Sequence, residues 1–410
     1  MEMTSLFYRD EILISNCVVD AFLLSTATLQ TVFVFINTIK QVQKQCDQTT
    51  RHNIRMFDSS MRAKFNSNTI FWPFLFSICV FLFLVSTFSS TEKISANDQK
   101  IGIIVVLTND TNPQDYSVAI KSVECYARAQ NYGFELVVDI NYNCHQTDKF
   151  FRRHCVVSKI LPRYDAILFI DADHGVVNPK RRIEEFMDPQ FDLIFYDRFF
   201  NWEVMAGSYI ARNSKFSIDF LSEFANFEQN LPKGAHGSDN GAIHLFLAEK
   251  IFPGSLEVAT CREVYYKCGN SDDLSAYTGC IRGVFGSQTD FGNIRLMKKG
   301  TGWSRDDWLT SGLWNPARDF MLHGWKTKQL KVLPEELLKP IPMNYAQWYN
   351  PFAGPIVVGR CYVGNTSWSY SPRLLADKSQ IEEALLEYAK KVDREKAKSL
   401  GRLPMILEKP

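Results

Sequence analysis

The stretch LFIDADHGVVNP, residues 168–179, decides which fold this chain can adopt. The apolar run over 166–170 predicts a buried strand, and Asp171 and Asp173 follow it at once. Two carboxylates one residue apart in a turn can face the same point and share a divalent cation. Mn²⁺ or Mg²⁺ is the expected cofactor, because both ions prefer oxygen ligands. The alternative for an isolated Asp-x-Asp is an acidic turn that binds nothing.

Strands and helices alternate around this motif. Continuous apolar runs predict further strands, and apolar residues at helical spacing predict the helices between them. The expected strands cover 101–107, 134–140, 166–170 and 193–196, and the expected helices cover 116–130 and 150–161. This alternation predicts an α/β fold with a mostly parallel sheet flanked by helices. Ligands of such sheets bind at the carboxyl ends of the strands, where Asp171 and Asp173 lie.

The bulk composition excludes one class of partner. The 410 residues suffice for one large or two ordinary domains, and a hydrophobic content of 46% with 22% charged residues is typical of a globular chain. The net charge of +1 offers no excess of basic residues for nucleic acid. No nucleic-acid partner is therefore expected.

The N-terminal part predicts a membrane anchor. Residues 69–88 (TIFWPFLFSICVFLFLVSTF) carry no charge over 20 positions, which suffices to cross a bilayer core of roughly 30 Å. Six Lys and Arg lie between 40 and 64, and two follow the span, so the N-terminal side is expected in the cytoplasm and the rest in the lumen. A weaker apolar segment, 21–36, is either a second span or an interfacial helix.

These segments set the expected domain boundaries. We expect a cytoplasmic region over 1–68, a transmembrane signal anchor over 69–88, a stem over 89–100, a catalytic domain over 101–375 and a charged C-terminal helix or tail over 376–410. The charged helix over 377–400 is expected to be a solvated surface element.

Two further features fit a lumenal domain. Asn109-Asp110-Thr111 and Asn365-Thr366-Ser367 match the acceptor pattern for N-glycosylation. Seven cysteines follow the predicted anchor, which permits three disulfides and one free thiol without fixing the pairing. They are Cys125, Cys144, Cys155, Cys261, Cys268, Cys280 and Cys361.

The chain resembles known families at these motifs. Its strand order with Asp-x-Asp is similar to that of GT-A glycosyltransferases, which use nucleotide-sugar donors. Residues of about 100–370 more closely resemble an uncharacterised domain family, best known from nematodes, that is grouped with them. The matching stretches include FRRHCVVSKIL (151–161), DADHGVVNPKRRIEEF (171–186), YDRFFNWEVMAGSYIARNS (196–214), HGSDNGAIH (236–244), MKKGTGWSRDDW (297–308) and DFMLHGWKT (319–327).

A second resemblance assigns roles to the middle of the chain. Fungal Golgi galactosyl- and mannosyltransferases and plant xylosyltransferases carry a small-residue strand and an acidic–amide pair after Asp-x-Asp. Here Ala206, Gly207 and Ser208 match the strand, where a sugar could approach the backbone, and Asp239 and Asn240 match the catalytic pair. Asn240 is shorter than the Gln that is more common in those relatives. The plain alternatives are a core strand for 206–208 and a helix cap for Asp239.

The resemblance also implies that residues late in the sequence complete the site. Related enzymes bind the metal with a late His and the donor phosphates with a nearby Lys, which His323 and Lys326 match here. Lys159, before the motif strand, is a further candidate for the diphosphate, whereas Arg152 and Arg153 are expected to be surface charges. Four tryptophans are candidates for stacking on sugar rings, with core packing as the alternative, and we assign Trp303 to the donor or substrate. They are Trp303, Trp308, Trp314 and Trp325.

Together these features predict a metal-dependent glycosyltransferase, a hexosyl- or pentosyltransferase of the GT-A type. It would move a sugar from a nucleotide-diphosphate donor to a glycan or glycoconjugate acceptor. The expected location is the Golgi or endoplasmic reticulum membrane, as a single-pass type II protein or, with 21–36, a two-span one. The alternatives are a non-catalytic GT-A-like sugar-binding module and, less favoured, a phosphatase of the haloacid dehalogenase type with Asp306 and Asp307 as its later acidic pair.

Overall fold

The computed structural model describes residues 99–333 and 346–409, all within one compact unit, Ser95–Pro410. The predicted anchor 69–88, the segment 21–36, the region 1–68 and nearly all of the stem lie outside the described residues. Within the described ranges, no helix combines the length and the apolar character that a membrane crossing requires.

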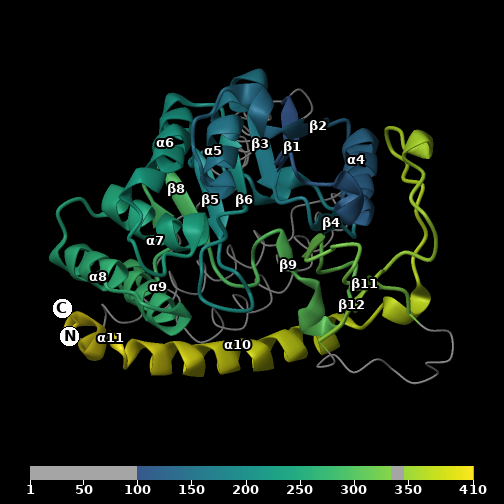
Figure 1. Cartoon of the computed structure of the whole chain (residues 1–410). Coiled ribbons are helices and arrows are strands. Elements are labelled where there is room, and N and C mark those ends of the chain that lie inside the picture. The colour runs from purple at the N-terminus through teal and green to yellow at the C-terminus, as the bar shows by residue number, and fades with distance from the viewer. Residues whose placement is uncertain (1–98, 334–345, 410) are drawn as a thin grey trace, which may run out of the picture. The chain divides into compact units, whose positions relative to one another are not determined.

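A seven-stranded sheet forms the centre of the unit (Figure 1). β1 pairs in parallel with β2 and β3, β5 pairs in parallel with β8, and β6 is antiparallel to both β3 and β5. Five of the seven strands therefore run in one direction, which confirms the predicted mostly parallel sheet. In spatial order the strands are β2 (Gly133–Val138), β1 (Ile101–Leu107), β3 (Ala166–Ile170), β6 (Ser208–Arg212), β5 (Leu193–Tyr196), β8 (Ile294–Met297) and β7 (Asp290–Phe291).

Both faces of the sheet are covered, because alternate residues of each strand point to opposite sides. On β1, Ile103 and Val105 pack with one apolar cluster and Ile104 with the other. The first cluster contains α4 (Ser117–Gln130), and the second contains α5 (Lys149–Ile160), α6 (Lys215–Asn226), α7 (Ser238–Ile251), α8 (Leu256–Tyr266) and α9 (Ser271–Phe285). The continuous apolar runs of the sequence thus correspond to strands buried on both faces.

A second, three-stranded sheet brings late residues to the Asp-x-Asp motif. It consists of β4 (His174–Val176), β10 (Met321–His323) and β9 (Ser304–Asp306), with β10 in the middle. In its register His323 lies opposite His174 on one side and Asp306 on the other. The late segment is therefore attached to the strand that directly continues the motif.

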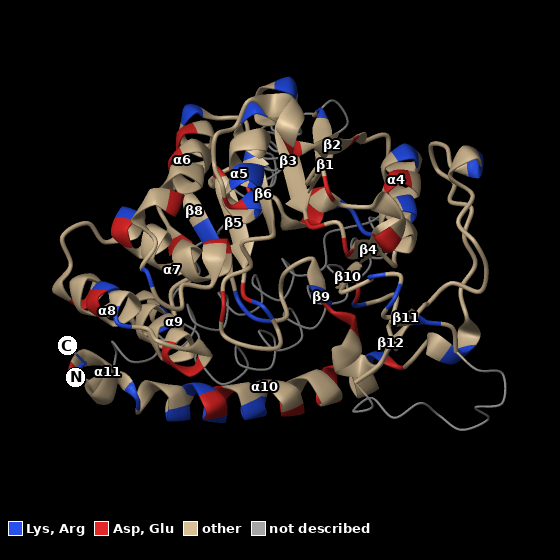
Figure 2. Cartoon of the chain, viewed as in Figure 1, with Lys and Arg blue, Asp and Glu red and all other residues tan. Residues whose placement is uncertain are grey.

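The C-terminal helix is packed on one side. α10 (Lys378–Leu400) contacts α9, and Ile381, Leu385 and Val392 on its inner face are buried. Its remaining surface carries charges of both signs along its length (Figure 2). The expectation of a solvated surface element therefore holds for only part of this helix, because its buried Ile381 and Leu385 belong to the first apolar cluster.

The remaining elements are short. They are β11 (Leu330–Lys331), β12 (Trp348–Tyr349), α11 (Leu403–Leu407) and the 3-10 helices η1 (Pro113–Tyr116), η2 (Asp139–Tyr142), η3 (Leu161–Arg163), η4 (Ile183–Phe186), η5 (Phe227–Asn230), η6 (Asp307–Thr310), η8 (Val358–Arg360) and η9 (Pro372–Leu374). Three disulfides connect elements of the unit, and Cys268 is a buried free thiol. The pairs are Cys125–Cys361, Cys144–Cys155 and Cys261–Cys280.

Candidate functional site

A pocket of about 320 Å³ lies at the carboxyl ends of β1, β2 and β3. Its position follows from the sheet, since loops leaving parallel strands at one edge leave a crevice between them. Asp171, Ala172 and Asp173 form part of its wall. The other lining residues are Val106, Leu107, Thr108, Thr111, Tyr116, Asp139, Lys149, Phe150, Arg153 and Lys326.

Asp171 is held on the sheet side of this pocket. Its backbone N–H donates to the Gly207 carbonyl at 2.8 Å, and its carboxylate is ion-paired with the Arg153 guanidinium. A Cβ at position 207 would lie 2.0 Å from Asp171 Oδ2, so glycine is required there for the carboxylate to occupy its place. The ion pair with Arg153 uses Asp171 Oδ1, so in the predicted role of metal ligand Asp171 would either bind the cation through Oδ2 or exchange Arg153 for it.

Arg153 belongs to a buried network behind Asp171. Its side chain comes from the middle of α5, is 6% exposed and also bonds Asp239, which is fully buried. His154 Nε2 lies 3.0 Å from the same Asp239 oxygen, and His154 Nδ1 lies 3.1 Å from the Tyr209 hydroxyl. Burial lowers the pKa of Arg153, but Asp171 and Asp239 outweigh this and raise it above its ordinary value. Arg153 is therefore a permanent buried cation beside the pocket.

Asp173 is surrounded by groups from the late segment. Its Oδ1 lies 3.3 Å from His323 Nε2, and its Oδ2 lies 3.8 Å from the half-exposed Lys326 Nζ. His323 Nδ1 lies 2.8 Å from Asp306 Oδ1, and since a carboxylate only accepts, the ring donates this hydrogen bond. Burial raises the pKa of Asp173, but His323 outweighs it and the net shift is downward. Asp173 is therefore an ionised carboxylate, and Asp306 orients the His323 ring so that its Nε2 faces Asp173.

His174 completes this group from the side. It is 1% exposed, and its ring centroid lies 4.5 Å from that of His323. Its Nε2 lies 3.4 Å from the Tyr196 hydroxyl, and its Nδ1 lies 4.0 Å from Asp173 Oδ1. Ligand atoms of Asp173, His174 and His323 all lie within 4.8 Å of one another, a spacing that could hold a metal ion.

The small-residue strand and Trp303 lie below the pocket rather than in it. Ala206 is fully buried in an apolar cluster, and the Ser208 hydroxyl accepts from Trp303 Nε1 at 2.9 Å. Trp303 is 2% exposed, so its assigned contact with donor or substrate is wrong in this structure: the ring is part of the core. Gly207 lies against the Asp171 carboxylate, as described above, and does not line the pocket.

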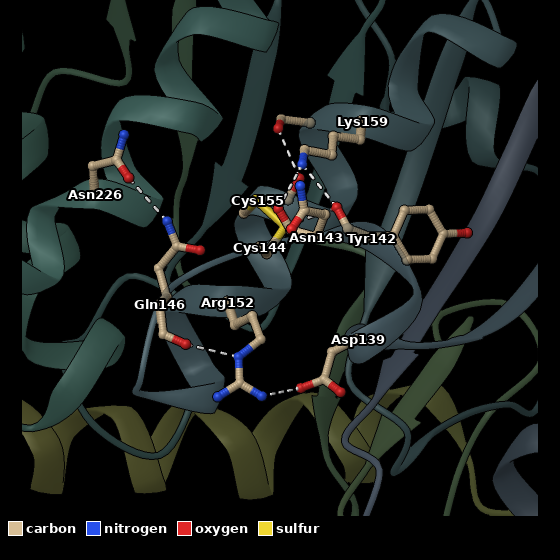
Figure 3. Close-up of a disulfide and its surroundings, with 10 residues drawn as sticks. Asp139, Tyr142, Asn143, Cys144, Gln146, Arg152, Cys155, Lys159 and Asn226 are labelled. Carbon is tan, nitrogen blue, oxygen red and sulfur yellow. Dashed lines mark hydrogen bonds and ion pairs between the residues drawn. A yellow bond between two sulfur atoms is a disulfide. The ribbon is translucent and has the colours of Figure 1, made fainter.

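The predictions for Lys159 and Arg153, both on α5, also need correction. Figure 3 shows the surroundings of Lys159. Lys159 donates to the carbonyls of Tyr142 and Asn143 at 2.7 and 3.0 Å, beside the Cys144–Cys155 disulfide, and it does not line the pocket. It lies in the last turn of α5, away from the strand ends. Arg153, which we expected to be a surface charge, takes the place at the pocket that we had assigned to Lys159.

Arg152 is also more than a surface charge. It donates to Asp139 at 2.7 Å, and that carboxylate is buried at the start of η2 and lines the pocket (Figure 3). The second Asp139 oxygen, Oδ1, is buried without a hydrogen-bond partner among the described residues. Asp139 lines the pocket, so a ligand there would lie close to this carboxylate.

The predicted catalytic pair lies at the start of α7. The helix cap is Gly237, in the left-handed region at φ 66°, so the alternative of Asp239 as a cap is wrong. Asp239 is fully buried and contacts Arg153 and His154, which means that it acts on the pocket through Arg153 rather than directly. Asn240 is partly buried, and its Oδ1 has no hydrogen-bond partner in the part of the chain that the structure describes.

The two glycosylation patterns differ in accessibility. Asn109 is exposed in the turn after β1. Asn365 is half-buried, and its side-chain nitrogen donates to the Arg360 carbonyl at 3.2 Å. A glycan at Asn365 would therefore have to replace this hydrogen bond, whereas one at Asn109 would not.

Sequence reasoning missed four groups that the structure places at or around the site: Arg153, Asp139, His174 and Asp306. His174 stands next to Asp173, so its position could have been noticed. Asp139 lies near the carboxyl end of the second predicted strand, 134–140, where a ligand-facing residue is expected. The roles of Arg153 and Asp306 carry no sequence signal, because both depend on contacts across 18 and 17 residues.

Comparisons with known proteins give a family but no activity. A glycosyltransferase involved in glycosylation of the major capsid of PBCV-1 is 16% identical over 38% of this chain and 78% of its own, with a TM-score of 0.32. The apo form of the glycosyltransferase GlyE of Streptococcus pneumoniae TIGR4 is 12% identical over 37% of this chain and 44% of its own, with a TM-score of 0.27. Similarities this low carry no argument.

The search of curated proteins found no match. One family model covers residues 123–340, which is more than half of the 410 residues and includes Arg153, both motif aspartates, His323 and Lys326. The chain therefore belongs to the family described as protein of unknown function, DUF273.

Proposed function

We propose that this chain is a metal-dependent glycosyltransferase that moves a hexosyl or pentosyl group from a nucleotide-diphosphate donor to a glycan or glycoconjugate acceptor. The observation that carries the proposal is that Asp171, Asp173 and Lys326 line one pocket on the carboxyl edge of the sheet and that His323 lies against Asp173. Anionic and cationic groups thus face one another where the resemblance to GT-A enzymes places the donor diphosphate. A non-catalytic sugar-binding module remains the alternative.

The residues around Asp173 fit a divalent cation. Asp173 Oδ1 and His323 Nε2 approach each other at 3.3 Å, and Asp306 holds the other His323 nitrogen. A carboxylate oxygen and an imidazole supported by a second carboxylate suit Mn²⁺ better than Mg²⁺. When bound, the cation supplies charge neutralisation for the diphosphate leaving group. Asp171 is an additional ligand if it binds through Oδ2 or if Arg153 releases it.

The pocket combines positive charge with aromatic rings. Lys326, Arg153 and Lys149 supply the positive charge that phosphates need. The rings of Tyr116 and Phe150 also line the pocket, and the Phe150 centroid lies 5.5 Å from Lys149 Nζ and 5.2 Å from the Arg153 guanidinium. Asp139 lines the same pocket, and its carboxylate is the acceptor proposed for a base N–H or a ribose hydroxyl. A volume of about 320 Å³ is within the range of small-ligand sites.

The acceptor would occupy the neighbouring part of the same sheet edge. A larger cavity, of about 710 Å³, lies where β5 and β8 end and is bounded by α9, the 298–301 segment and α10. It contains both charged groups and rings, including Asp197, Arg282 and Trp202, which suits a polar, hydroxyl-rich ligand.

The membrane topology remains part of the proposal. The basic segment 40–64 next to the apolar stretch 69–88 supports a cytoplasmic N-terminus and a lumenal catalytic domain in the Golgi or endoplasmic reticulum. Three disulfides in the described unit agree with an oxidising compartment. Protease treatment of sealed microsomes should spare the C-terminal domain, and its digestion from outside would refute this orientation.

Hydrolysis of nucleotide sugars by the full-length chain tests the function directly. A panel of UDP- and GDP-sugars should yield free nucleotide with Mn²⁺ and none with EDTA, and Asp173→Asn should abolish the reaction. Arg163→Met, an exposed change outside the pocket, is the control and should react like the wild type. Donor binding without turnover across the panel would favour the sugar-binding module instead.

A further inference from the structure

The nitrogen atoms next to Asp173 go beyond what an Asp-x-Asp site requires. His174 is buried, and its Nδ1 has no hydrogen-bond partner among the residues that the structure describes. The backbone carbonyl of Asp171 also lies near the His174 ring. Buried side-chain nitrogens are rarely left without a partner, so this one, beside a carboxylate, indicates a partner outside the protein chain.

The geometry leaves room for that partner to be a cation. Ligand atoms of one ion, each about 2.1 Å from it, lie at most about 4.2 Å apart. His174 Nδ1 and His323 Nε2 lie 4.0 and 3.3 Å from the same oxygen, Asp173 Oδ1. All three ligand atoms fit within 4.8 Å, so a small rotation of the rings closes the widest separation.

Neighbouring side chains already orient the two imidazole rings toward Asp173. His323 Nδ1 donates to Asp306, which leaves Nε2 to face Asp173, and the Tyr196 hydroxyl lies near His174 Nε2, which leaves Nδ1 to do the same. Such outer partners orient metal-binding imidazoles in known sites. The pairing of β10 with β4 fixes both rings relative to each other.

We infer that His174 is a third protein ligand of the cation, with Asp173 and His323, and that this set of two nitrogens and one oxygen selects Mn²⁺ or Co²⁺ over Mg²⁺. The inference rests on the proposed function only in that it places a cation at this site. Imidazole is a good ligand for first-row transition metals, whereas Mg²⁺ takes oxygen ligands almost alone. Asp171 stays with Arg153 and is not needed in the set.

Pulsed electron paramagnetic resonance of the Mn²⁺-loaded wild-type chain tests this without any variant and without activity. Two directly bound imidazole nitrogens should couple to the Mn²⁺ electron spin. A single coupled nitrogen, or none, would overturn the inference. Competition should also show that Mg²⁺ displaces Mn²⁺ only at a concentration at least tenfold above that of Mn²⁺, and equal affinity for the two ions would count against it.

Three variants sharpen the test. His174→Leu should lose one nitrogen coupling and bind Mn²⁺ at least tenfold more weakly. His174→Asn can place an amide oxygen near the position of Nδ1, so it should retain a cation but lose most of the preference for Mn²⁺. His145→Gln, an exposed histidine elsewhere, should match the wild type. Wild-type coupling in a folded His174→Leu chain would contradict the assignment.

The outcome is separable from that of the proposed function. If two nitrogens couple to Mn²⁺ but the chain does not hydrolyse nucleotide sugars, the ligand set is supported and the transferase proposal fails. If the chain hydrolyses nucleotide sugars with Mn²⁺ but only one nitrogen couples, the transferase proposal is supported and the ligand set fails. Neither measurement requires knowledge of the sugar or the acceptor.

Discussion

Asp171 and Asp173 leave the end of the same strand one residue apart, and they enter different neighbourhoods. Asp171 lies against the sheet, where Arg153 and Asp239 continue a buried chain of charges into α5 and α7. Asp173 faces the late segment, where His174, His323 and Lys326 surround it. In the first neighbourhood both carboxylates are paired with Arg153, although Asp239 Oδ1 has no hydrogen-bond partner among the described residues. In the second, His174 Nδ1 is the atom without a hydrogen-bond partner among the described residues. We therefore expect the two carboxylates of one motif to have different tasks, Asp171 a structural one and Asp173 one in binding.

The neighbourhood of Asp171 should respond most strongly to loss of its cation. Arg153→Met leaves Asp239 buried without its main partner, and breaking such a pair costs about 3–5 kcal/mol. We expect a loss of that size in the free energy of unfolding, measured by urea denaturation of the metal-free chain. Arg163→Met removes a half-exposed pair with Glu135 and should cost less than about 1 kcal/mol. Equal losses in the two variants would remove the distinction drawn here.

The binding neighbourhood should control cation affinity. Asp173→Asn removes a charged oxygen at nearly constant volume, and we expect Mn²⁺ affinity to fall by about 100-fold, or about 2.7 kcal/mol. Asp171→Asn should weaken Mn²⁺ by less than about tenfold, because Arg153 already occupies that carboxylate. Titration calorimetry on both folded variants measures this. If Asp171→Asn proved as damaging as Asp173→Asn, the cation would lie between the two aspartates.

A methyl group under Asp171 should disturb the neighbourhood of this carboxylate. A Cβ in Gly207→Ala would meet Asp171 Oδ2 at 2.0 Å and the Met205 side chain at 3.0 Å, so the carboxylate must move. We expect a destabilisation of about 1–3 kcal/mol in urea denaturation, as for other overpacked sites. Gly283→Ala, in α9, meets nothing within 4 Å and should be neutral or slightly stabilising, because alanine favours helix. A neutral Gly207→Ala would mean that Asp171 is loosely held.

The binding neighbourhood should also make stability depend on pH. Burial lowers the pKa of His323, but Asp173 and then Asp306 outweigh it and raise the pKa from an ordinary 6.5 to about 10. The folded state therefore holds this proton more tightly than the unfolded state. Its stabilisation is complete below pH 6.5 and is lost as the pH rises towards 10.

In the metal-free chain, the free energy of unfolding should therefore fall as the pH rises from 7 to 10, by at most about 1.4 kcal/mol per pH unit, because the folded state loses this stabilising proton. His323→Gln should flatten the slope in that window, as measured by urea denaturation at several pH values. His145→Gln should keep the wild-type slope. A slope unchanged by His323→Gln would show that the proton is not held at this residue.

The fold was largely predictable because strands that are buried on both faces of a sheet consist of continuous apolar runs, which can be recognised in the sequence. The strands over 101–107, 166–170 and 193–196 occur at those residues, and β6 begins at Ser208 of the small-residue strand. The structure adds β7 and β8, which are short. The site was predictable only in part. Asp173, His323 and Lys326 lie close together, whereas Lys159 and Trp303 lie elsewhere. A lysine on a predicted helix gives no indication of which turn of that helix faces a pocket.

The sequence by itself determined the strand that ends in Asp171 and Asp173, since an apolar run and its termination are local properties of the chain. Only the tertiary structure decided which carboxylate is available. His323 follows Asp173 by 150 residues, and its position comes from the pairing of β10 with β4. Arg153 contacts Asp171 because the turn of α5 that carries it packs beside the end of β3. Pairings over such separations depend on packing free energy summed over the whole core, which no short stretch of sequence contains.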